Sequence, residues 1–496
     1  MPFPHKNLFK PTAFWCPVSM YTGFMKFLFW AYLLFLVWAD ATVTNPADPD
    51  LWHRLALGDV LWRTGHFPSG DYFSYLADYQ RIADHEWGSA LIFYGLYQAF
   101  GFSAFVVLKL VTLGITLVLV VNAGLQGRKP TMFLAAFYAL VLLAMLPSFQ
   151  STVRCMVFTH IFFALWLLWY QMERRGRPVL TIFYVLTMVI WANLHGGFVT
   201  GLAWLLVVGM IEFALRGDWK IWALRLGLCT AATLINPFGY DLWISTGRAL
   251  TVTRHGFNEW APVSWWPEPL SYPGYKLLLF GTIVALVLLV RFRGWRRLDY
   301  RAFILLVLFL VISLTSVRHT SLFAAVAGAL LPGLFAVEFA FDGSDNPVHR
   351  LGLMAVRSTL LLIPLYATLR LIPGAGLELE YPHVACPREA IEYLKREKIS
   401  GRLLVPFNYG SYALWALRGQ MRVSMDGRYD LVYRPKTYQR VEDFFLARGD
   451  WQSLLTNPAP NAILTPVNAT ISAKLQNEPK WIEIWHNGDD AIFVPQ

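Results

Sequence analysis

The chain has 496 residues, of which 56% are hydrophobic, 16% aromatic and only 15% charged. With a mean hydropathy of +0.44, this composition excludes an ordinary soluble protein and indicates a polytopic membrane protein. The formal net charge is +10. Its basic residues gather in short loops between apolar runs, so membrane topology explains the charge and we expect no nucleic-acid partner.

Long apolar runs recur along the chain. A helix needs about 20 mainly apolar residues to cross the core of a bilayer. About eleven runs approach this length, which predicts an α-helical polytopic membrane protein with about eleven transmembrane helices. We expect the spans at 27–44, 103–124, 131–147, 155–171, 179–194, 197–215, 221–236, 275–291, 302–317, 320–339 and 351–372.

The basic residues between these spans predict the orientation. Lys and Arg in short loops stay in the cytoplasm. If the N-terminus is cytoplasmic, every basic cluster falls in a cytoplasmic loop, and the segment after the last span lies outside. The clusters are Lys6, Lys10 and Lys26; Arg128 and Lys129; Arg174, Arg175 and Arg177; Arg216, Lys220 and Arg225; and Arg291, Arg293, Arg296, Arg297 and Arg301.

Residues 45–102 form the first outer loop, which is too long and too polar to be a simple connector. In its first half, Leu51 and other apolar residues fall on one side of a predicted helix, whereas Arg54 and Asp59 fall elsewhere. A second predicted helix begins near His85 and ends at a glycine. Both helices are predicted to be amphipathic and to lie along the membrane surface.

The sequence Asp48-Pro49-Asp50 follows the first span and opens this loop. Two carboxylates at the membrane surface suit glycosyl transfer, which needs either a base for the acceptor proton or a divalent cation, such as Mg or Mn, on the leaving phosphate. Asp48 and Asp50 are therefore the predicted catalytic residues and metal ligands. The structural alternative is that Asp50 caps the following helix while Asp48 is solvated.

Further polar residues recur at the outer ends of the predicted helices. Ionisable groups at membrane depth are costly and usually functional, and Arg or His there suits the phosphate of a lipid-linked substrate whose tail stays in the bilayer. The predicted substrate-binding residues are His85, Glu86, Arg154, Asn193, His195, Arg318 and His319.

Structural roles are open for several of these residues. His85 and Glu86 also suit helix capping and surface solvation. The segment from Asn193 to Gly197 also suits a tight helix hairpin, and Arg318 can snorkel to the interface.

The C-terminal segment alternates predicted helix and strand, and its roughly 120 residues are enough to bury a core. We therefore divide the chain into a transmembrane domain, residues 1–373, and an extracytoplasmic α/β domain, residues 374–496. Its predicted elements are a helix at 387–397, a strand at 402–407, a turn at 408–410, strands at 423–425 and 462–466, and a hairpin at 481–494 that turns at Asn487-Gly488.

Two other patterns favour structure over chemistry. The segment Asp426 to Asp430 suits an acceptor or metal site, but an Asp-Gly turn followed by a salt-bridged Arg428 is the simpler interpretation. The four cysteines show no spacing typical of a metal site or a redox pair, so beyond a divalent cation we expect no cofactor.

With these motifs in place, the sequence resembles the GT-C superfamily of integral-membrane glycosyltransferases, which use polyprenyl-phosphate sugars, and a poorly characterised bacterial group within it. The resemblance covers most of the chain. It implies an aspartate of the first outer loop as general base or metal ligand, and basic residues at outer helix ends that hold the carrier phosphate. The residues that carry it are Asp48, Asp50-Leu51-Trp52-His53, Phe67-Pro68, Asp71, Phe73-Ser74, His85-Glu86-Trp87, Asn193 to Gly197, Gly401-Arg402, Tyr409-Gly410 and Asp426 to Asp430.

The resemblance implies hexosyl or pentosyl transfer from a polyprenyl-phosphate carrier to a glycan, lipid or protein at the outer face of the bacterial inner membrane. The expected partners are that donor, the extracytoplasmic acceptor and membrane lipids. Two other functions stay open. A lipid or solute transporter needs buried ionisable residues near the midplane, for which Lys109 and Arg357 are candidates. A non-catalytic subunit of a polysaccharide assembly system would use the outer domain for docking.

Overall fold

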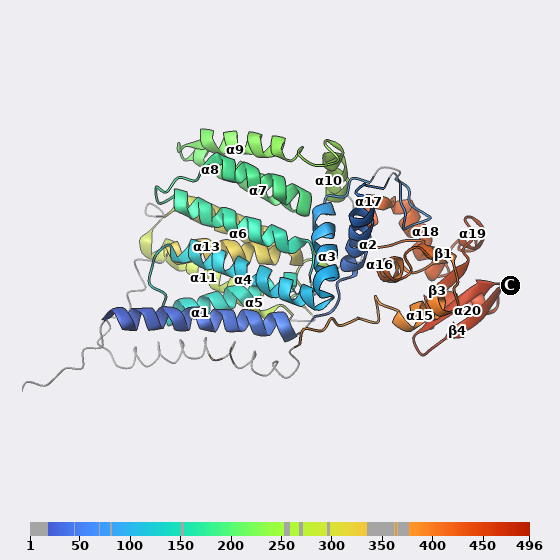
Figure 1. Cartoon of the computed structure of the whole chain (residues 1–496). Helices are drawn as coiled ribbons and strands as arrows, with labels where there is room; N and C mark the ends of the chain where they lie inside the picture. The colour runs from blue at the N-terminus through green and yellow to red at the C-terminus, as the bar shows by residue number, and fades with distance from the viewer. Residues whose placement is uncertain are drawn as a thin grey trace, which may run out of the picture.

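A computed structural model of the chain describes residues 18–43, 45–68, 70–79, 82–149, 153–251, 258–266, 271–294, 298–334, 362, 365 and 376–496. Long helices run side by side in one bundle, and a smaller domain with a sheet stands at one end of it (Figure 1). The predicted span at 351–372 lies outside these residues apart from 362 and 365, and Lys6, Lys10, Arg296, Arg297 and Arg357 also lie outside them.

The bundle helices coincide with the predicted spans. They are α1 (Val18–Val43), α4 (Ser103–Leu125), α5 (Met132–Met145), α6 (Met156–Glu173), α7 (Thr181–Leu194), α8 (Phe198–Ala214), α9 (Trp219–Ala232), α11 (Pro273–Arg293), α12 (Tyr300–Ser313) and α13 (Thr320–Leu334). Among the described residues, five stretches are long and apolar enough to cross a membrane alone: Gly23–Val43, Ser103–Leu125, Met132–Phe149, Pro273–Phe292 and Val317–Leu334.

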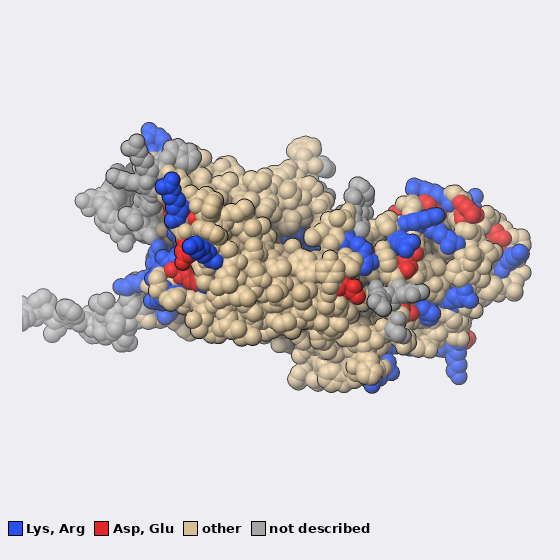
Figure 2. Space-filling view, turned by 90° about the horizontal axis from the view of Figure 1, so that it is seen from above, with Lys and Arg blue, Asp and Glu red and all other residues tan. Residues whose placement is uncertain are grey.

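The surface of the bundle is that of a multi-pass membrane protein. On the face seen in Figure 2, a wide belt of the bundle has almost no charged side chains, and charges gather towards its two ends. Large apolar side chains point outward from this belt; Phe213 is 65% and Phe280 67% exposed. Because a soluble protein rarely exposes such a continuous apolar surface, the belt marks the lipid-facing region. Loops 126–131, 174–180 and 215–218, which carry basic residues, lie at the end away from the sheet domain (Figure 1).

Two helices of the first loop, α2 (Pro49–Thr64) and α3 (Trp87–Phe100), lie across the ends of the bundle helices (Figure 1). The predicted course along the membrane plane stays a prediction. The two helices pack closely at Gly58, where a Cβ atom would approach the Ala90 carbonyl oxygen to 2.3 Å. Glycine is therefore required by packing at this position.

The prediction that α2 has a polar, solvated side is wrong. Arg54 and Asp59 are only 1% and 4% exposed. The C-terminal domain covers the side of α2 that faces away from the bundle, so α2 is buried on all sides from residue 51 to residue 59. Trp62, an apolar residue near the end of α2, is 62% exposed. The periodicity of apolar residues within one helix does not reveal that residues more than 300 positions away pack over its polar side.

The C-terminal domain holds a five-stranded sheet in the order β2-β1-β3-β5-β4. β1 is parallel to β2 and β3, whereas β5 is antiparallel to β3 and β4. The predicted hairpin at Asn487-Gly488 is confirmed. The strands are β1 (Gly401–Leu404), β2 (Met421–Val423), β3 (Ala462–Pro466), β4 (Trp481–His486) and β5 (Asp490–Pro495), and the helices are α15 (Arg388–Arg396), α16 (Phe407–Ala416), α17 (Tyr429–Val432), α18 (Pro435–Phe445), α19 (Ser453–Thr456) and α20 (Thr470–Gln476).

The predicted turn at 408–410 is wrong, because these residues belong to α16. The glycine that prompted the prediction serves packing. A Cβ atom on Gly410 would lie 1.8 Å from the Met425 carbonyl oxygen, so only glycine lets α16 approach the segment after β2.

Apolar and ionic contacts join the C-terminal domain to the first loop. Trp52 of α2 lies edge-on to Tyr412 of α16, with ring centroids 5.1 Å apart, in a hydrophobic cluster that both parts of the chain share. Ser74 forms an isolated parallel bridge with Val423 of β2. Arg428 forms ion pairs with Asp71 at 2.9 Å and with Asp426 at 2.7 Å. The predicted salt bridge of Arg428 is therefore confirmed, and it also fastens the first loop to the C-terminal domain.

Candidate active site

The two predicted catalytic aspartates share one partner, Arg154, which lies just before α6. Its Nε atom lies 3.0 Å from Asp48 Oδ2, and its Nη2 atom lies 2.9 Å from Asp50 Oδ2. Its Nη1 atom pairs with Glu259 of the short helix η2 (Asn258–Trp260). Three carboxylates therefore surround one guanidinium, which we call the Arg154 cluster.

The two aspartates have different environments. Asp48 is the N-cap of α2: its carboxylate accepts a hydrogen bond from the Asp50 N–H at 2.9 Å, and the residue is 3% exposed. The structural alternative had Asp50 as the helix cap and Asp48 solvated. In the structure, Asp48 caps the helix and is buried. The Asp50 side chain is 36% exposed. Within the described residues, Asp50 Oδ1 accepts no hydrogen bond, so one carboxylate oxygen is open to a ligand.

The Asp50 carboxyl is held in its ionised form. Burial raises its pKa, but the Arg154 guanidinium outweighs burial, and the pKa lies below its ordinary value. The C-terminal domain lies against this carboxylate, because a Cβ atom on Gly427 would meet Asp50 Oδ1 at 3.0 Å. An ionised acceptor of hydrogen bonds therefore lies at the contact between the two domains.

His53 lies beside Asp50 at the same contact. Its Nδ1 atom is 3.3 Å from the Ser411 hydroxyl of α16. Burial, together with the neighbouring Arg54, lowers the pKa of His53 to about 4. His53 is therefore neutral at neutral pH and adds no positive charge to the site.

A second group of charges surrounds Arg54, and we call it the Arg54 cluster. Arg54 pairs with Asp84 at 2.6 Å and with Glu86 at 3.2 Å. Burial raises the pKa of Asp84, but Arg54 outweighs it and lowers the pKa to about 2. Glu86 in turn lies 3.4 Å from His195 Nε2 and 3.8 Å from His85 Nε2. The predicted residues His85, Glu86 and His195 thus lie together.

The segment between α7 and α8 forms a tight helix hairpin, which is the structural role that the sequence left open for it. His195 Nδ1 accepts a hydrogen bond from the Gly197 N–H at 3.0 Å, which leaves Nε2 to donate toward Glu86. Asn193 is used in packing. Its Oδ1 atom accepts from the indole N–H of Trp87 at 2.8 Å, and its Nδ2 atom donates to the Ile235 carbonyl at 2.9 Å.

Arg318 and His319 occupy the helix η4 (Val317–His319). Arg318 Nη1 lies 3.6 Å from Glu259 Oε1, and its guanidinium stacks 4.5 Å from the centroid of the Trp260 ring. Glu259 therefore connects Arg318 to the Arg154 cluster. His319 Nδ1 instead lies 3.1 Å from the Thr315 hydroxyl.

The sequence did not predict four residues of this region: His53, Arg54, Asp84 and Glu259. Glu259 had one available signal, since it directly precedes Trp260 in an outer loop rich in aromatic residues. Arg54 was noted only as part of a polar helix side. Arg154 was predicted to hold a phosphate, and here its guanidinium nitrogens face three carboxylates, with which a phosphate would compete.

The geometry bears on the predicted divalent cation. In the part of the chain that the structure describes, no group of three or more His, Cys, Asp or Glu side chains is arranged to hold a metal ion. Asp48 and Asp50 offer two carboxylates, but Arg154 already supplies the opposing positive charge. A cation at this position would have to displace the guanidinium.

Comparison with known proteins identifies the fold. ArnT from Cupriavidus metallidurans in the apo state is 14% identical, with 96% of this chain and 98% of that chain covered and a TM-score of 0.58. The same protein bound to undecaprenyl phosphate is 14% identical over 95% of this chain and 98% of that chain, with a TM-score of 0.56. Mycobacterial arabinofuranosyltransferase AftD is 14% identical, with a TM-score of 0.52 over 97% of this chain and 40% of its own.

No family model matches the chain, and no curated protein matches it in sequence. The structural likeness nevertheless extends over nearly the whole chain, from the helical bundle to the C-terminal sheet. The chain therefore has the fold of ArnT and AftD, in agreement with the fold that the resemblance to the GT-C superfamily predicted.

Proposed function

We propose that the protein transfers a sugar from a polyprenyl-phosphate carrier to a hydroxyl group of an acceptor, at the end of the bundle that carries the C-terminal domain. The observation that carries the proposal is Asp50. It is an ionised, part-exposed carboxylate with one open oxygen, next to Arg154 and against the C-terminal domain, in a chain with the GT-C fold. ArnT, which shares this fold, has been solved with undecaprenyl phosphate bound.

In the proposed reaction, Asp50 acts as the general base. The acceptor hydroxyl donates its proton to Asp50 Oδ1 while its oxygen forms a bond to the anomeric carbon of the donor. The bond between that carbon and the phosphate oxygen breaks, and the polyprenyl phosphate leaves with the bonding electrons. Asp48 takes a positioning role, because both of its carboxylate oxygens are engaged, one by the Asp50 N–H and one by Arg154.

Arg318 is the proposed partner of the donor phosphate. Its guanidinium is part-exposed, lies 3.6 Å from Glu259, stacks on Trp260 and donates to the Met156 sulfur at 3.8 Å. A guanidinium can donate two parallel hydrogen bonds to a phosphate, which suits a negative charge that grows as the carrier leaves. Arg154, paired with three carboxylates, instead orients Asp48 and Asp50. His195 and His85 position Glu86, and Asn193 and His319 support the surrounding helices.

The location follows from the distribution of charge. We place the loops with basic residues in the cytoplasm of a bacterium, with the N-terminus on the same side, because such loops resist translocation. The C-terminal domain then lies outside the inner membrane and receives an extracytoplasmic glycan, lipid or protein. A transporter is disfavoured. Lys109 is buried near Asp40 and Glu380, six residues from the start of α4 and so close to the site end of the bundle rather than its midplane.

The test is turnover by purified protein in lipid with a panel of polyprenyl-phosphate sugars that includes hexoses and pentoses. We expect one donor to be consumed, and Asp50→Asn to reduce its turnover about 10²- to 10⁴-fold. Asp450→Asn, an exposed carboxylate in the C-terminal domain, is the matched control and should leave turnover unchanged. Full turnover in Asp50→Asn, or no turnover of any donor by stable protein, would contradict the proposal and favour a non-catalytic subunit.

The same assay tests whether Asp50 acts as a base or as a metal ligand. Turnover that survives chelation of divalent cations supports Asp50 as a base assisted by Arg154. Turnover that is lost with a chelator and restored by Mg²⁺ or Mn²⁺ supports a cation held by Asp48 and Asp50, which is the second role predicted for this pair.

A further inference from the structure

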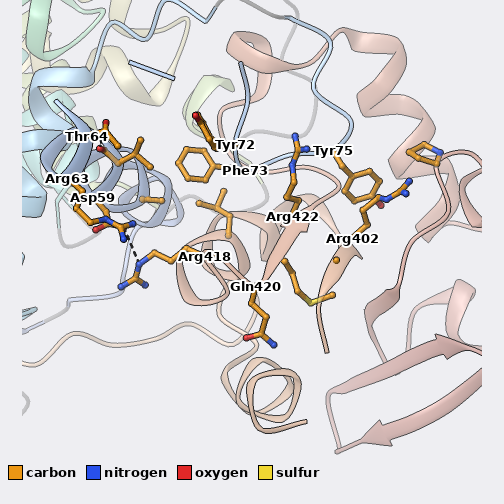
Figure 3. A pocket seen from close by; sticks show the side chains of 17 residues that line it. Asp59, Arg63, Thr64, Tyr72, Phe73, Tyr75, Arg402, Arg418, Gln420 and Arg422 are labelled. Atoms are coloured by element: carbon orange, nitrogen blue, oxygen red, sulfur yellow. Dashed lines mark hydrogen bonds and ion pairs between the residues drawn. The ribbon is translucent and has the colours of Figure 1, made fainter. Parts of the chain in front are cut away.

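A cleft of about 910 Å³ lies between the C-terminal half of α2 and the C-terminal domain (Figure 3). It is distinct from the Arg154 cluster, which occupies the first turn of α2 and the residues before α6. α2, the segment around residues 72–75, the end of α16, and strands β1 and β2 all contribute walls to the cleft.

The charge of this cleft is unbalanced. Arg63, Arg402, Arg418 and Arg422 line it, against one carboxylate, that of Asp59. Asp59 is already engaged, because it pairs with Arg63 and, at 3.5 Å, with Arg418, and it accepts a hydrogen bond from the Tyr94 hydroxyl at 2.6 Å. The cleft therefore presents a net positive charge to whatever enters it.

The arginines differ in how far the protein itself uses them. Arg422 donates to the backbone carbonyl of Asp71 at 2.7 Å and is largely structural. The Arg402 side chain forms no ion pair or hydrogen bond with any residue that the structure describes. The nearby Tyr75 hydroxyl is buried and lacks a hydrogen-bond partner among the same residues. Arg402 is exposed and available to a ligand, and the buried Tyr75 hydroxyl beside it is an unfilled polar group, since buried polar groups are normally hydrogen-bonded.

The other side chains suit sugar rings. Tyr72 is 60% exposed at the mouth of the cleft. It presents the flat face of a ring with a hydroxyl at its end, a combination that accepts apolar and polar contacts together. Gln420 adds an amide oxygen that can accept a hydrogen bond, since its amide N–H groups already donate to the carbonyls of Leu394 and Ile399. Charged, aromatic and amide groups in one cleft match a ligand that is both anionic and rich in hydroxyl groups.

The position of the cleft relates it to the proposed chemistry. Ala56 lies at the end of the cleft nearest Asp50, six residues or about 9 Å further along the axis of α2. Arg63 lies about 20 Å from Asp50 along the same axis. A ligand that fills the cleft can therefore present one end to Asp50 only if it is extended. A chain of several sugar units satisfies this requirement, whereas a single small acceptor does not.

We propose that the cleft binds an acidic glycan, a sugar chain that carries carboxylate or phosphate groups, and holds it as the acceptor. The role of the glycan as the acceptor rests on the proposed function, whereas its binding to the cleft does not. A lipid headgroup is disfavoured as the source of the anion, because α2 and α3 stand between the bundle and the C-terminal domain (Figure 1). Each helix is about 10 Å wide, so an anchored lipid would have to rise past both.

The experiment measures binding to the full chain in nanodiscs of neutral lipid, without any donor. The probes are oligogalacturonate, which carries carboxylates, a phosphorylated oligomannose, and neutral maltooligosaccharides of the same length. We expect saturable binding of one acidic probe that weakens with salt, and no saturable binding of the neutral probe. The double variant Arg63→Gln/Arg402→Gln should weaken that binding about ten-fold.

The matched control removes the same charge elsewhere on the outer parts of the chain. Arg396→Gln/Arg448→Gln alters two exposed arginines outside the cleft and should change the binding less than two-fold. Equal weakening by both double variants would overturn the proposal, since it would indicate attraction by net charge alone. Cleft-dependent binding of phosphatidylglycerol vesicles, without binding of either acidic glycan, would also overturn the proposal. Because no donor is present, failure here is distinguishable from failure of the transfer assay.

Discussion

The Arg54 cluster and the Arg154 cluster are built from the same groups, one guanidinium among carboxylates at the start of α2, yet they differ in access to solvent. In the Arg54 cluster the side chains of Arg54 and Asp84 are 2% and 6% exposed. In the Arg154 cluster the side chains of Arg154 and Asp50 are 26% and 36% exposed. One cluster is sealed, and the other opens toward the C-terminal domain.

This difference separates a structural role from a chemical one. A sealed ion pair adds little net stability, but removing one partner leaves an uncompensated buried charge, which is strongly destabilising. An open carboxylate held ionised by a neighbour costs less to disturb and is available to a substrate. Identical residue types in one loop therefore have opposite consequences on mutation.

The largest effect expected from this comparison is on stability. Arg54→Met leaves Asp84 and Glu86 without their partner in a buried site, so the free energy of unfolding should fall by about 3–5 kcal/mol. Thermal unfolding in detergent, followed by tryptophan fluorescence, measures the change. Arg63→Met on the same helix is the control. That side chain is 65% exposed, and its loss should cost at most about 1 kcal/mol. Equal unfolding temperatures for the two variants would remove the distinction between the clusters.

The next effect is a pH dependence of stability. His53 has a pKa of about 4 in the folded protein against an ordinary 6.5. Between these values the unfolded chain binds a proton that the folded chain does not, so stability should fall as the pH drops from 6.5 to about 4, by about 3 kcal/mol in all. Asp84, whose folded pKa is about 2, loses its contribution only below its ordinary 3.8.

Unfolding midpoints measured from pH 7 to pH 4 test this assignment. His53→Gln should reduce the slope across that window, because glutamine does not titrate; a smaller slope should remain, because burial also lowers the pKa of His195. An unchanged slope in His53→Gln would mean that another group is responsible.

The fold was largely predictable from the sequence because its signals are local. Runs of apolar residues marked the bundle helices, and the pair Asn487-Gly488 marked the last hairpin. The site was predictable only in part. Asp48, Asp50 and Arg154 were singled out one at a time, but no sequence pattern indicates that residues 104 positions apart form an ion pair.

The errors share one physical cause, which is burial by distant parts of the chain. Arg54 looked solvated because nothing in α2 reveals the C-terminal domain that covers it. Gly410 looked like a turn residue, whereas its role is a close approach to Met425. Local propensity describes a segment alone, and tertiary packing decides which of its faces meets water.

A smaller effect is expected at Asp48. Asp48→Ala removes the N-cap of α2, which should cost about 1 kcal/mol and at most about 2. It also removes one of the three carboxylates that hold Arg154, so turnover should fall, but less than in Asp50→Asn. Turnover and the unfolding midpoint are measured on the same preparation. A larger loss of turnover in Asp48→Ala than in Asp50→Asn would exchange the roles of the two residues.

The smallest change tests the contact between the open cluster and the C-terminal domain. A methyl group at Gly427 would lie 3.0 Å from Asp50 Oδ1, 2.8 Å from the Ser411 hydroxyl and 3.3 Å from His53 Nδ1. Gly427→Ala should therefore crowd the open oxygen and reduce turnover about ten-fold, which corresponds to about 1.4 kcal/mol of barrier, with little change in the unfolding midpoint. Gly488→Ala, where a Cβ atom meets nothing within 4 Å, is the control. If Gly427→Ala keeps full turnover, the acceptor does not approach Asp50 from the C-terminal domain, and the site must be entered from the bundle side.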